Sequence, residues 1–289
     1  TVLIRKALRN QVRSFNTVFE QLVHSSNGGP MFRNIFVFIL ISLMIAACGK
    51  DAAEEKPTTS TKKSPAKSSA YQALESVDDG GTVSGTVLYK GGDADASVKI
   101  SKDQTTCDPS GKGNRTAGSL IVADGKLKNA VVFLSDIKKG KSFDAQDVTV
   151  DNVECKFTPH VTVARKGDTL IARNSDPVLH NANMVIRKGS KRRPWENVPL
   201  PQKDSTVKKP VKKTGLVDIK CDAHEWMQGY LYVTDHPYAV VTDATGAFSL
   251  SDVPAGDYTL KAWHEKLGFK SQKITVKAGD SAAQDLTYE

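Results

Sequence analysis

The sequence predicts an all-β protein with two sandwiches. Short segments of alternating apolar and polar residues are separated by Asp, Gly, Asn and Pro. This pattern is typical of half-buried strands joined by tight turns. After residue 47, no long segment repeats its apolar residues at a helical period. About 210 residues of short strands are too many for one small sandwich, so we expect two.

An apolar run precedes the strands. Met31 and Arg33 lead into residues 35–47, which are apolar and end in small residues. A run of this length with a basic start is typical of a secretory signal rather than a membrane span. Its end, residues 45–49, resembles a bacterial lipobox, which implies cleavage before Cys48 and a lipid on Cys48. An ordinary signal peptide or a short anchor helix is the alternative.

The remaining N-terminal residues fit no fold pattern. Residues 1–30 lack a core or targeting pattern, and we expect them to be upstream translation or an unrelated extension, with Met31 as the start. Gly49 after the lipobox cysteine resembles the outer-membrane default of lipoproteins, which implies a lipid-anchored, periplasm-facing protein of the bacterial cell envelope. Residues 49–77 have almost no large apolar side chains. We expect them to be a disordered tether, with an interaction tail as the alternative.

The charge excludes one class of partner. The chain has 40 Lys and Arg against 32 Asp and Glu, a formal net charge of +8. Five basic residues and one acidic residue in residues 1–47 account for half of that excess. The remainder is an ordinary charge for a soluble domain, so we expect no nucleic-acid partner.

Strand signals begin at Gly81. Residues 82–89 alternate over most of their length and end in a Lys-Gly-Gly turn. Residues 120–122 and 130–134 are further short strands, with an Asp-Gly turn between them. Near the C-terminus, residues 242–250 and 253–263 alternate in the same way, with Asp, Gly and Pro at the turns.

The C-terminal pattern, residues 242–263, resembles the carboxypeptidase-regulatory-like domain, a small transthyretin-like β-sandwich that is generally non-catalytic. The strand at 81–89 resembles the opening strand of that family. We therefore expect residues 81 to about 140 and 237–289 to form one sandwich, split around an inserted domain. A serial arrangement with an independent N-terminal subdomain is the alternative.

The segment between them carries a compact motif of donor atoms. Cys221, His224 and Met227 are spaced Cys-x-x-His-x-x-Met. Predicted strands flank this loop at 216–221 and 229–233, so three side chains can converge on one ion. A fourth donor, His180, follows the apolar segment 169–173 and a polar turn.

Two imidazoles, a thiolate and a weak thioether are the donor set of a blue-copper electron-transfer site. A Cys-x-x-His pair also occurs in zinc sites, and a buried thiol beside an unrelated histidine is the third alternative. Met184 is another possible thioether, but it lies further along the presumed strand.

This arrangement resembles the cupredoxin family, most closely its amicyanin and plastocyanin branch, over residues 146–235. The resemblance implies a Greek-key sandwich with copper ligands His180, Cys221, His224 and Met227. It also implies single-electron transfer. His224 lies on a loop that we expect to reach the surface, so we expect it to be the electron exit. Trp226, between two ligands, is expected to shield the site from water rather than relay charge. Here two residues separate Pro177 from the histidine, which departs from the family pattern. Copper storage, or a structural envelope lipoprotein without electron transfer, is the alternative function.

The other histidines do not suggest an enzyme. His160, His236 and His264 remain in the chain after the signal segment once the ligands are assigned, and no His-x-His pair occurs. A catalytic copper needs additional histidines. We expect all three to be structural or surface residues.

Two cysteines remain after Cys48 and Cys221 are assigned. An exported compartment favours a disulfide between Cys107 and Cys155. A redox or second metal position is the alternative.

The insert between His180 and Cys221 is strongly basic. We expect either a solvated face or a docking surface that steers an acidic redox partner to the copper end. The basic residues are Arg187, Lys188, Lys191, Arg192, Arg193, Lys203, Lys208, Lys209, Lys212 and Lys213.

The expected organisation follows from these segments. It comprises an upstream extension (1–30), a lipoprotein signal peptide (31–47), a disordered tether (48–78), the first part of the carboxypeptidase-regulatory-like sandwich (79–142), a cupredoxin domain (143–236) and the second part of the first sandwich (237–289).

Overall fold

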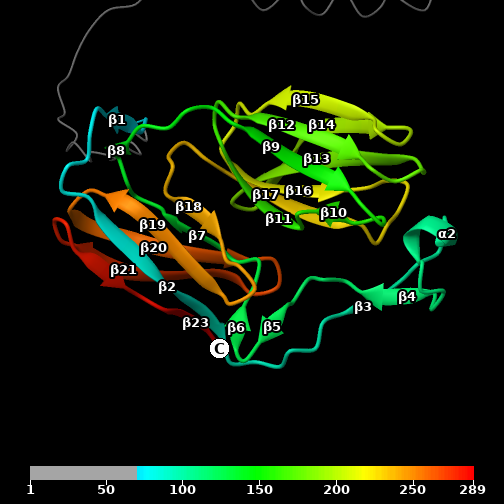
Figure 1. Ribbon diagram of the computed structural model, residues 1–289, viewed down its shortest axis with the longest axis horizontal. Coiled ribbons are helices and arrows are strands. Elements are labelled where there is room, and N and C mark those ends of the chain that lie inside the picture. Colours follow the sequence, from blue (N-terminus) through cyan, green and yellow to red (C-terminus); the bar gives the residue numbers. More distant parts are fainter. Residues whose placement is uncertain (1–69) are drawn as a thin grey trace, which may run out of the picture. The chain divides into compact units, whose positions relative to one another are not determined.

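The computed structural model describes residues 70–289 (Figure 1). The predicted extension, signal peptide, lipidated Cys48 and most of the tether lie outside the described residues. Within residues 70–289, no helix is long and apolar enough to cross a membrane.

The described chain is nearly all β-strand, which confirms the predicted fold class, and its one helical segment is α2 (Gln104–Cys107). The strands are β1 (Gln72–Leu74), β2 (Gly81–Tyr89), β3 (Ser97–Lys99), β4 (Asn114–Thr116), β5 (Val122–Ala123), β6 (Lys126–Leu127), β7 (Val131–Leu134), β8 (Lys139–Lys141), β9 (Asp147–Asn152), β10 (Phe157–Thr158), β11 (Val161–Arg165), β12 (Thr169–Asn174), β13 (His180–Lys188), β14 (Lys191–Leu200), β15 (Thr206–Pro210), β16 (Gly215–Lys220), β17 (Gln228–Thr234), β18 (Ala239–Val241), β19 (Ala247–Val253), β20 (Gly256–His264), β21 (Gly268–Val276), β22 (Ser281–Ala283) and β23 (Leu286–Tyr288).

One sandwich, which we name the flanking sandwich, is built from both ends of the described chain. One of its sheets has the order β18-β7-β20-β21, and the other has β19-β2-β6-β5 with β22 and β23 beside β2. Strand β2 pairs antiparallel with β19, so Thr86 faces Ala247 across the sheet. The core between the sheets includes Val83, Leu134 and Leu260, all fully buried. Segments from before and after the inserted region therefore share one core.

The inserted region, residues 147–234, forms the central sandwich. Its sheets have the orders β10-β9-β12-β15 and β11-β17-β16-β13-β14. In β16 the alternation predicted from the sequence is present, because Val217 and Ile219 are buried in the core of this sandwich. Asp218 points the other way and pairs with Arg187 and Arg192 at 2.7 and 2.6 Å. Cys221 follows β16 on the core side.

A smaller apolar cluster joins the two sandwiches. Trp263 of β20 meets Tyr230 of β17 edge to face, with ring centroids 5.1 Å apart. Phe133 of β7 lies 4.6 Å from Tyr232 of β17. His160, just before β11, makes a hydrogen bond to Glu265, just after β20. Apolar and polar contacts thus fix both sandwiches against each other.

Residues 90–121, which we name the arm, connect β2 to β5 by a long excursion. The arm contains β3, β4 and α2, which lie beside the end of the central sandwich (Figure 1). The Asp95 carboxylate accepts backbone N–H groups of Gly118, Ser119 and Leu120, which ties the return of the arm to its start. A disulfide joins Cys107 of the arm to Cys155 of the central sandwich.

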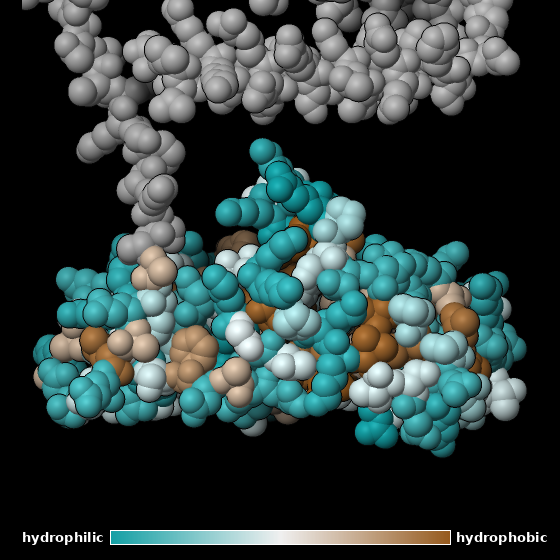
Figure 2. Space-filling model, turned by 90° about the horizontal axis from the view of Figure 1, so that it is seen from above, coloured by the Kyte–Doolittle hydropathy of each residue, from teal (hydrophilic) through white to brown (hydrophobic). Residues whose placement is uncertain are grey.

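The surface is mainly polar. Figure 2 shows hydrophilic side chains over most of the face seen from above, with hydrophobic side chains between them. The large apolar side chains that are exposed in the described region are scattered through the sequence: Ile121, Val153, Leu179 and Phe269.

Candidate metal centre

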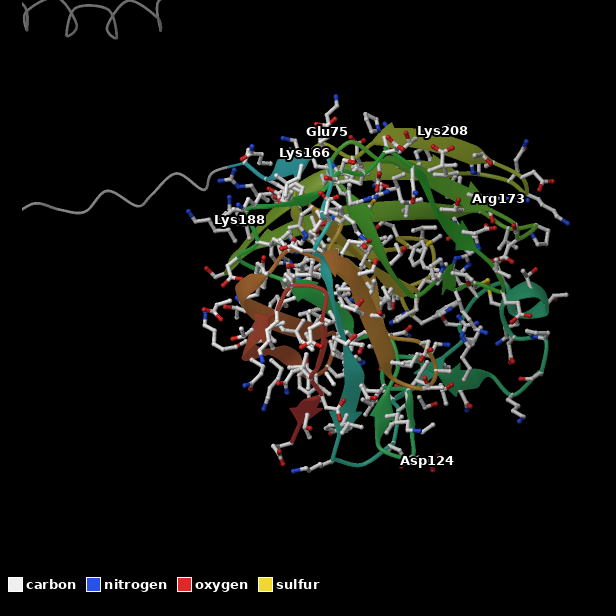
Figure 3. The ribbon with its side chains drawn as sticks, turned by 60° about the vertical axis from the view of Figure 1, so that its left-hand side comes forward. Glu75, Asp124, Lys166, Arg173, Lys188 and Lys208 are labelled. Atoms are coloured by element: carbon white, nitrogen blue, oxygen red, sulfur yellow. A yellow bond between two sulfur atoms is a disulfide. The ribbon has the colours of Figure 1, made fainter. Side chains whose placement is uncertain are left out.

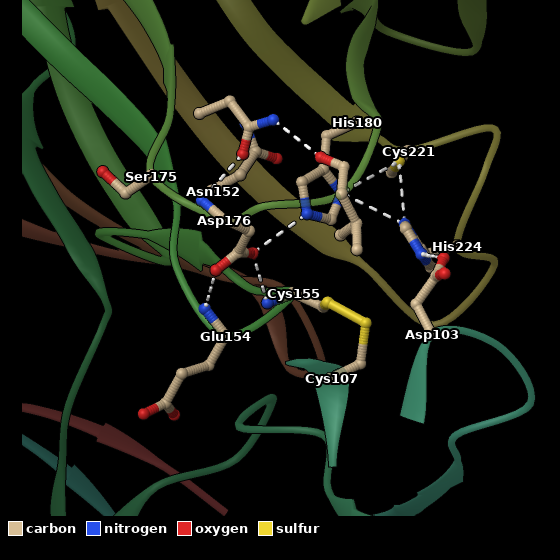
Figure 4. A network of polar contacts seen from close by, with 12 residues as sticks. Asp103, Cys107, Asn152, Glu154, Cys155, Ser175, Asp176, His180, Cys221 and His224 are labelled. Atoms are coloured by element: carbon tan, nitrogen blue, oxygen red, sulfur yellow. Dashed lines mark hydrogen bonds and ion pairs between the residues drawn. A yellow bond between two sulfur atoms is a disulfide. The ribbon is translucent and has the colours of Figure 1, made fainter. Parts of the chain in front are cut away.

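Three of the four predicted ligands meet at one end of the central sandwich. The Cys221 Sγ lies 3.7 Å from Nδ1 of His180 and 3.7 Å from Nδ1 of His224. The two Nδ1 atoms are 3.1 Å apart (Figure 4). Both imidazoles are fully buried, and the thiol is 3% exposed. The site is therefore a small, dry cluster of one sulfur and two nitrogen atoms.

Strand ends bring these side chains together. His180 is the first residue of β13, Cys221 directly follows β16, and these strands pair antiparallel. His224 lies on the short loop between β16 and β17, where the Met227 N–H donates to its carbonyl at 3.0 Å. This hydrogen bond keeps the loop short and tight, so Cys221, His224 and Met227 all lie at one end of the sandwich.

A carboxylate holds the second nitrogen of each imidazole. Nε2 of His180 is 2.9 Å from Asp176 Oδ2, and Nε2 of His224 is 2.9 Å from Asp103 Oδ2. Asp176 also accepts the backbone N–H groups of Glu154 and Cys155 at 2.7 and 2.8 Å (Figure 4). Carboxylates on the outer nitrogen are typical of metal-ligating histidines, because they fix the ring and its tautomer.

The facing Nδ1 atoms fit a bound cation. A carboxylate accepts hydrogen bonds, so each Nε2 carries a proton, and a neutral ring then presents a lone pair at Nδ1. Two lone pairs 3.1 Å apart, beside a thiolate, repel one another unless a proton or a cation lies between them. A metal ion satisfies all three atoms at once, and the residues present therefore fit a metal.

The thiol is prepared to ionise. Burial raises the pKa of Cys221, but hydrogen bonds with His180 and His224 outweigh that effect and lower the pKa to about 6. Burial lowers the pKa of His224, but hydrogen bonds with Cys221 and Asp103 raise it overall. The thiolate, which is the form that binds metal, is thus favoured near neutral pH.

Met227 lies in the same core as Cys221 and is 2% exposed. Met184, the alternative thioether, is also buried in that core, but it sits four residues into β13 and pairs with Ile219. Trp226 stacks at a tilt on His224, with centroids 5.1 Å apart. This position agrees with a role in shielding the imidazole.

The expected surface position of His224 is wrong. Its loop was expected to reach the surface and make this residue the electron exit, whereas its side chain is fully buried. Asp103 of the arm covers its outer nitrogen. The arm, which sequence reasoning did not connect with the site, is the physical reason for the difference.

Residues around the thiolate were also missed. Asn181 Oδ1 lies 3.5 Å from Cys221 Sγ and accepts the Asp222 N–H at 2.7 Å. Asp222 in turn accepts the side-chain amides of Asn181, Asn183 and Asn197 at 2.7, 2.9 and 3.3 Å. These polar side chains fix the loop beyond the ligands. Adjacency to His180 and Cys221 was the available signal for Asn181 and Asp222.

Half of the basic residues of the insert line a groove away from the candidate metal ligands. Lys188, Lys191 and Arg193 line a groove of about 780 Å³ with Lys166 and Lys212. His180 begins β13 and Lys188 ends it, so the two are roughly 26 Å apart at 3.3 Å per residue. Figure 3 shows Lys166 and Lys188 near each other and away from Arg173. Arg173 lies near the end of β12, the strand that leads into the loop of Asp176 and His180. A partner in this groove would not contact the loop of Cys221.

The other histidines lie elsewhere. His160 bonds Glu265 between the sandwiches. His236 and His264 are buried in or beside the flanking sandwich, and burial lowers the pKa of each to about 4.

Comparisons with known proteins give partial matches. A family model described as polysaccharide lyase family 4, domain II, matches residues 211–284, from the end of the central sandwich into the flanking sandwich. This family differs from the carboxypeptidase-regulatory-like family expected for that region. No curated protein matches the chain.

Solved structures similar to part of the chain include copper proteins. A purple cupredoxin from Nitrosopumilus maritimus is 24% identical over 31% of this chain and 99% of that chain, with a TM-score of 0.26. A point mutant of amicyanin, in a reduced Cu(I) form, is 20% identical over 32% of this chain and 84% of that chain, with a TM-score of 0.25. A Cu-containing nitrite reductase from Thermus scotoductus SA-01 is 22% identical over 32% of this chain, with a TM-score of 0.26, and the match spans only 23% of the reductase.

Proposed function

We propose that the protein holds one copper ion through His180, Cys221, His224 and Met227 and carries single electrons. The observation that carries this proposal is the convergence of the Cys221 sulfur and two Nδ1 atoms within 3.7 Å in a buried cluster. One soft thiolate, two imidazoles and a nearby thioether are the donors of a blue-copper centre. Bound copper supplies a couple between Cu(I) and Cu(II).

The residues of the chain prepare the site for that role. Asp176 and Asp103 hold the two imidazoles in place before any ion arrives. The lowered pKa of Cys221 supplies the thiolate. Burial of all four side chains keeps water from the donors. A rigid, dry site of this kind shapes a redox potential and needs little rearrangement when an electron moves.

We propose a carrier rather than an enzyme. His160, His236 and His264 occupy positions outside the donor cluster, and a catalytic copper needs further histidines of its own. We also keep lipid attachment at Cys48 and an envelope location as proposals from the sequence. An acidic redox partner matches the charge of the basic groove. Binding of this partner would weaken with rising salt. The groove would recruit the partner without bringing it into contact with the loop of Cys221.

The visible absorption spectrum of the purified protein with Cu(II) tests the central proposal. We expect an intense blue band that ascorbate bleaches. The band should vanish in Cys221→Ser, which removes the thiolate, and persist in His236→Asn, which changes a buried histidine away from the donors. A colourless wild type with weak copper uptake would contradict the proposal, and tight zinc binding without colour would favour a structural metal site.

A further inference from the structure

The arm reaches from one sandwich to the metal end of the other. It leaves the flanking sandwich after β2 and returns to it in β5. Between these points Ile100 is fully buried in the core of the central sandwich, and Val98 packs against the same core. The Lys102 ammonium donates to the Ala223 carbonyl, in the metal loop, at 3.4 Å. The arm is therefore part of the metal end of the central sandwich.

Asp103 is the point at which the arm touches a ligand. Its carboxylate lies 2.9 Å from Nε2 of His224. Its backbone adopts the left-handed region, with φ 45° and ψ 41°, where Asp is one of the few non-glycine residues that occur. Helix α2 begins directly afterwards and ends at Cys107. The carboxylate and the half-cystine are thus held one helical turn apart.

The disulfide secures that turn against the site. Cys107 and Cys155 are 1% and 0% exposed. Their sulfur atoms and a ring nitrogen of His224 lie within 4.8 Å of one another. Figure 4 shows the disulfide beside both imidazoles. The Arg115 guanidinium donates to the carbonyls of Cys107 and Glu154 at 3.2 and 2.6 Å, and also to that of Cys155.

We propose that the arm is a latched cover of the metal centre. The Cys107–Cys155 disulfide is the latch, and Asp103 is a positioning residue that holds His224 through its outer nitrogen. Loss of the latch exposes the donor cluster to solvent. Loss of the carboxylate loosens His224 and speeds metal release. The inference rests on the proposed function where it takes His224 as a metal ligand, but the covering of Cys221 requires no metal.

Alkylation of Cys221 in the metal-free protein tests the latch. Iodoacetamide is added without denaturant, and the peptide that contains Cys221 is followed by mass spectrometry. We expect the rate to rise at least tenfold in the Cys107→Ser/Cys155→Ser variant, because thiol reactivity depends on access. Gly92→Ala, which lies on the arm, keeps the latch and places its Cβ more than 4 Å from any neighbouring atom, should leave the rate unchanged. An equal rate in the double variant and the wild type would overturn the cover.

Asp103→Asn keeps the disulfide and provides a second measurement should the double variant not fold. Release of bound Cu(II) to an excess of chelator should be about tenfold faster, the lower end of the range for changing the outer partner of a ligating histidine, because the amide oxygen still accepts from Nε2 but the carboxylate charge is lost. Asp93→Asn, the same change at an exposed position on the arm, should behave like the wild type. Equal release from Asp103→Asn and the wild type would overturn the positioning role.

The two readouts separate the two hypotheses. A protein that takes up no copper, but whose Cys221 is unmasked by removal of the latch, would refute the copper proposal and keep the cover. A blue protein whose Cys221 is equally reactive with and without the latch would support the copper proposal and refute the cover.

Discussion

Asp176 links one imidazole to the backbone of a neighbouring loop. Its two carboxylate oxygens accept the N–H groups of Glu154 and Cys155 and the outer nitrogen of His180. In Asp176→Asn the new amide group would face one of these donors. We expect metal affinity to fall by about 10–100-fold and the free energy of unfolding to fall by about 1–3 kcal/mol. Competition with a chelator and urea unfolding measure the two effects.

Asp168→Asn is the matched control for that change. Asp168 is 1% exposed and accepts the N–H groups of Gln146 and Arg165 at 2.9 and 2.7 Å, but it contacts no proposed ligand. We expect a similar loss of stability with unchanged metal affinity. Equal losses of affinity in both variants would mean that Asp176 acts only through global stability.

His236 should make stability depend on pH. Burial lowers the pKa of His236 to about 4, below its value of 6.5 in the unfolded chain. Between these values the unfolded chain binds a proton that the folded chain does not, so the free energy of unfolding falls as pH falls from 6.5 to about 4. The loss is up to about 3 kcal/mol for one such histidine.

His236→Asn removes this titration and can keep an acceptor for the Tyr238 N–H, which is 3.2 Å from Nδ1. Because His264 has a similarly lowered pKa, we expect the variant to lose about half of the histidine-linked pH dependence. Urea unfolding at pH 7 and pH 4.5 measures it. An unchanged difference between the two pH values would show that His236 does not remain neutral in the folded protein.

The sequence indicates the candidate ligand residues, but not the residues around them. The spacing of Cys221, His224 and Met227 is local, so a motif reveals it. The contact between Asp103 and His224 joins positions 121 residues apart, and no periodicity or spacing in the sequence of the arm indicates it. Only the folded path of the chain brings that carboxylate to the imidazole.

At the level of elements, Gly85 allows a close approach of strands. A Cβ at this position of β2 would lie 2.1 Å from the Gln284 carbonyl oxygen, between β22 and β23. The backbone must shift to admit it, so we expect Gly85→Ala to cost about 1–3 kcal/mol. Hydrogen exchange of the Gln284 amide, which donates to Ser84 at 2.8 Å, should become faster.

Gly92→Ala is the corresponding control, because no atom lies within 4 Å of an added Cβ. Its unfolding free energy should stay within about 0.5 kcal/mol of the wild type. A Gly85→Ala protein as stable as this control would mean that β22 and β23 move apart at little cost.

Strands with a clear alternation were predicted close to their observed bounds. The predicted strand at 169–173 is β12 (Thr169–Asn174), and that at 229–233 is β17 (Gln228–Thr234). The basic insert was expected as a solvated face or a docking surface, and its bounds as strands were not predicted: much of it is the hairpin of β13 and β14. The tip of this hairpin, residues 188–193, is exposed and charged, so the period-2 pattern of apolar residues is absent there.

At the scale of the whole molecule, the chain passes between the sandwiches repeatedly. The arm, the β8–β9 connection and the β17–β18 connection all join them, and the disulfide closes one of these paths. The metal donors and the basic groove lie at opposite ends of the central sandwich. Docking by charge and electron exchange at the metal would therefore use different surfaces.

Because the chain connections and the disulfide join the two sandwiches, we predict that the sandwiches unfold together. A substitution at Trp263 tests this prediction. Its side chain is 3% exposed, meets Tyr230 at 5.1 Å, and lies under the Arg187 guanidinium at 5.8 Å. Trp263→Ala should cost about 3–5 kcal/mol. Because the lost contacts bridge the sandwiches, the single transition of the wild type should separate into two in urea.

Far-UV circular dichroism and the proposed copper absorption band, followed in the same titration, report the two sandwiches differently, because all four proposed ligands belong to the central sandwich. The curves should coincide in the wild type and diverge in Trp263→Ala. Trp195→Ala, which removes an indole packed against the core of the central sandwich, should lower stability without separating the curves. Coincident curves in Trp263→Ala would show that the covalent connections, rather than the aromatic contact, couple the two sandwiches.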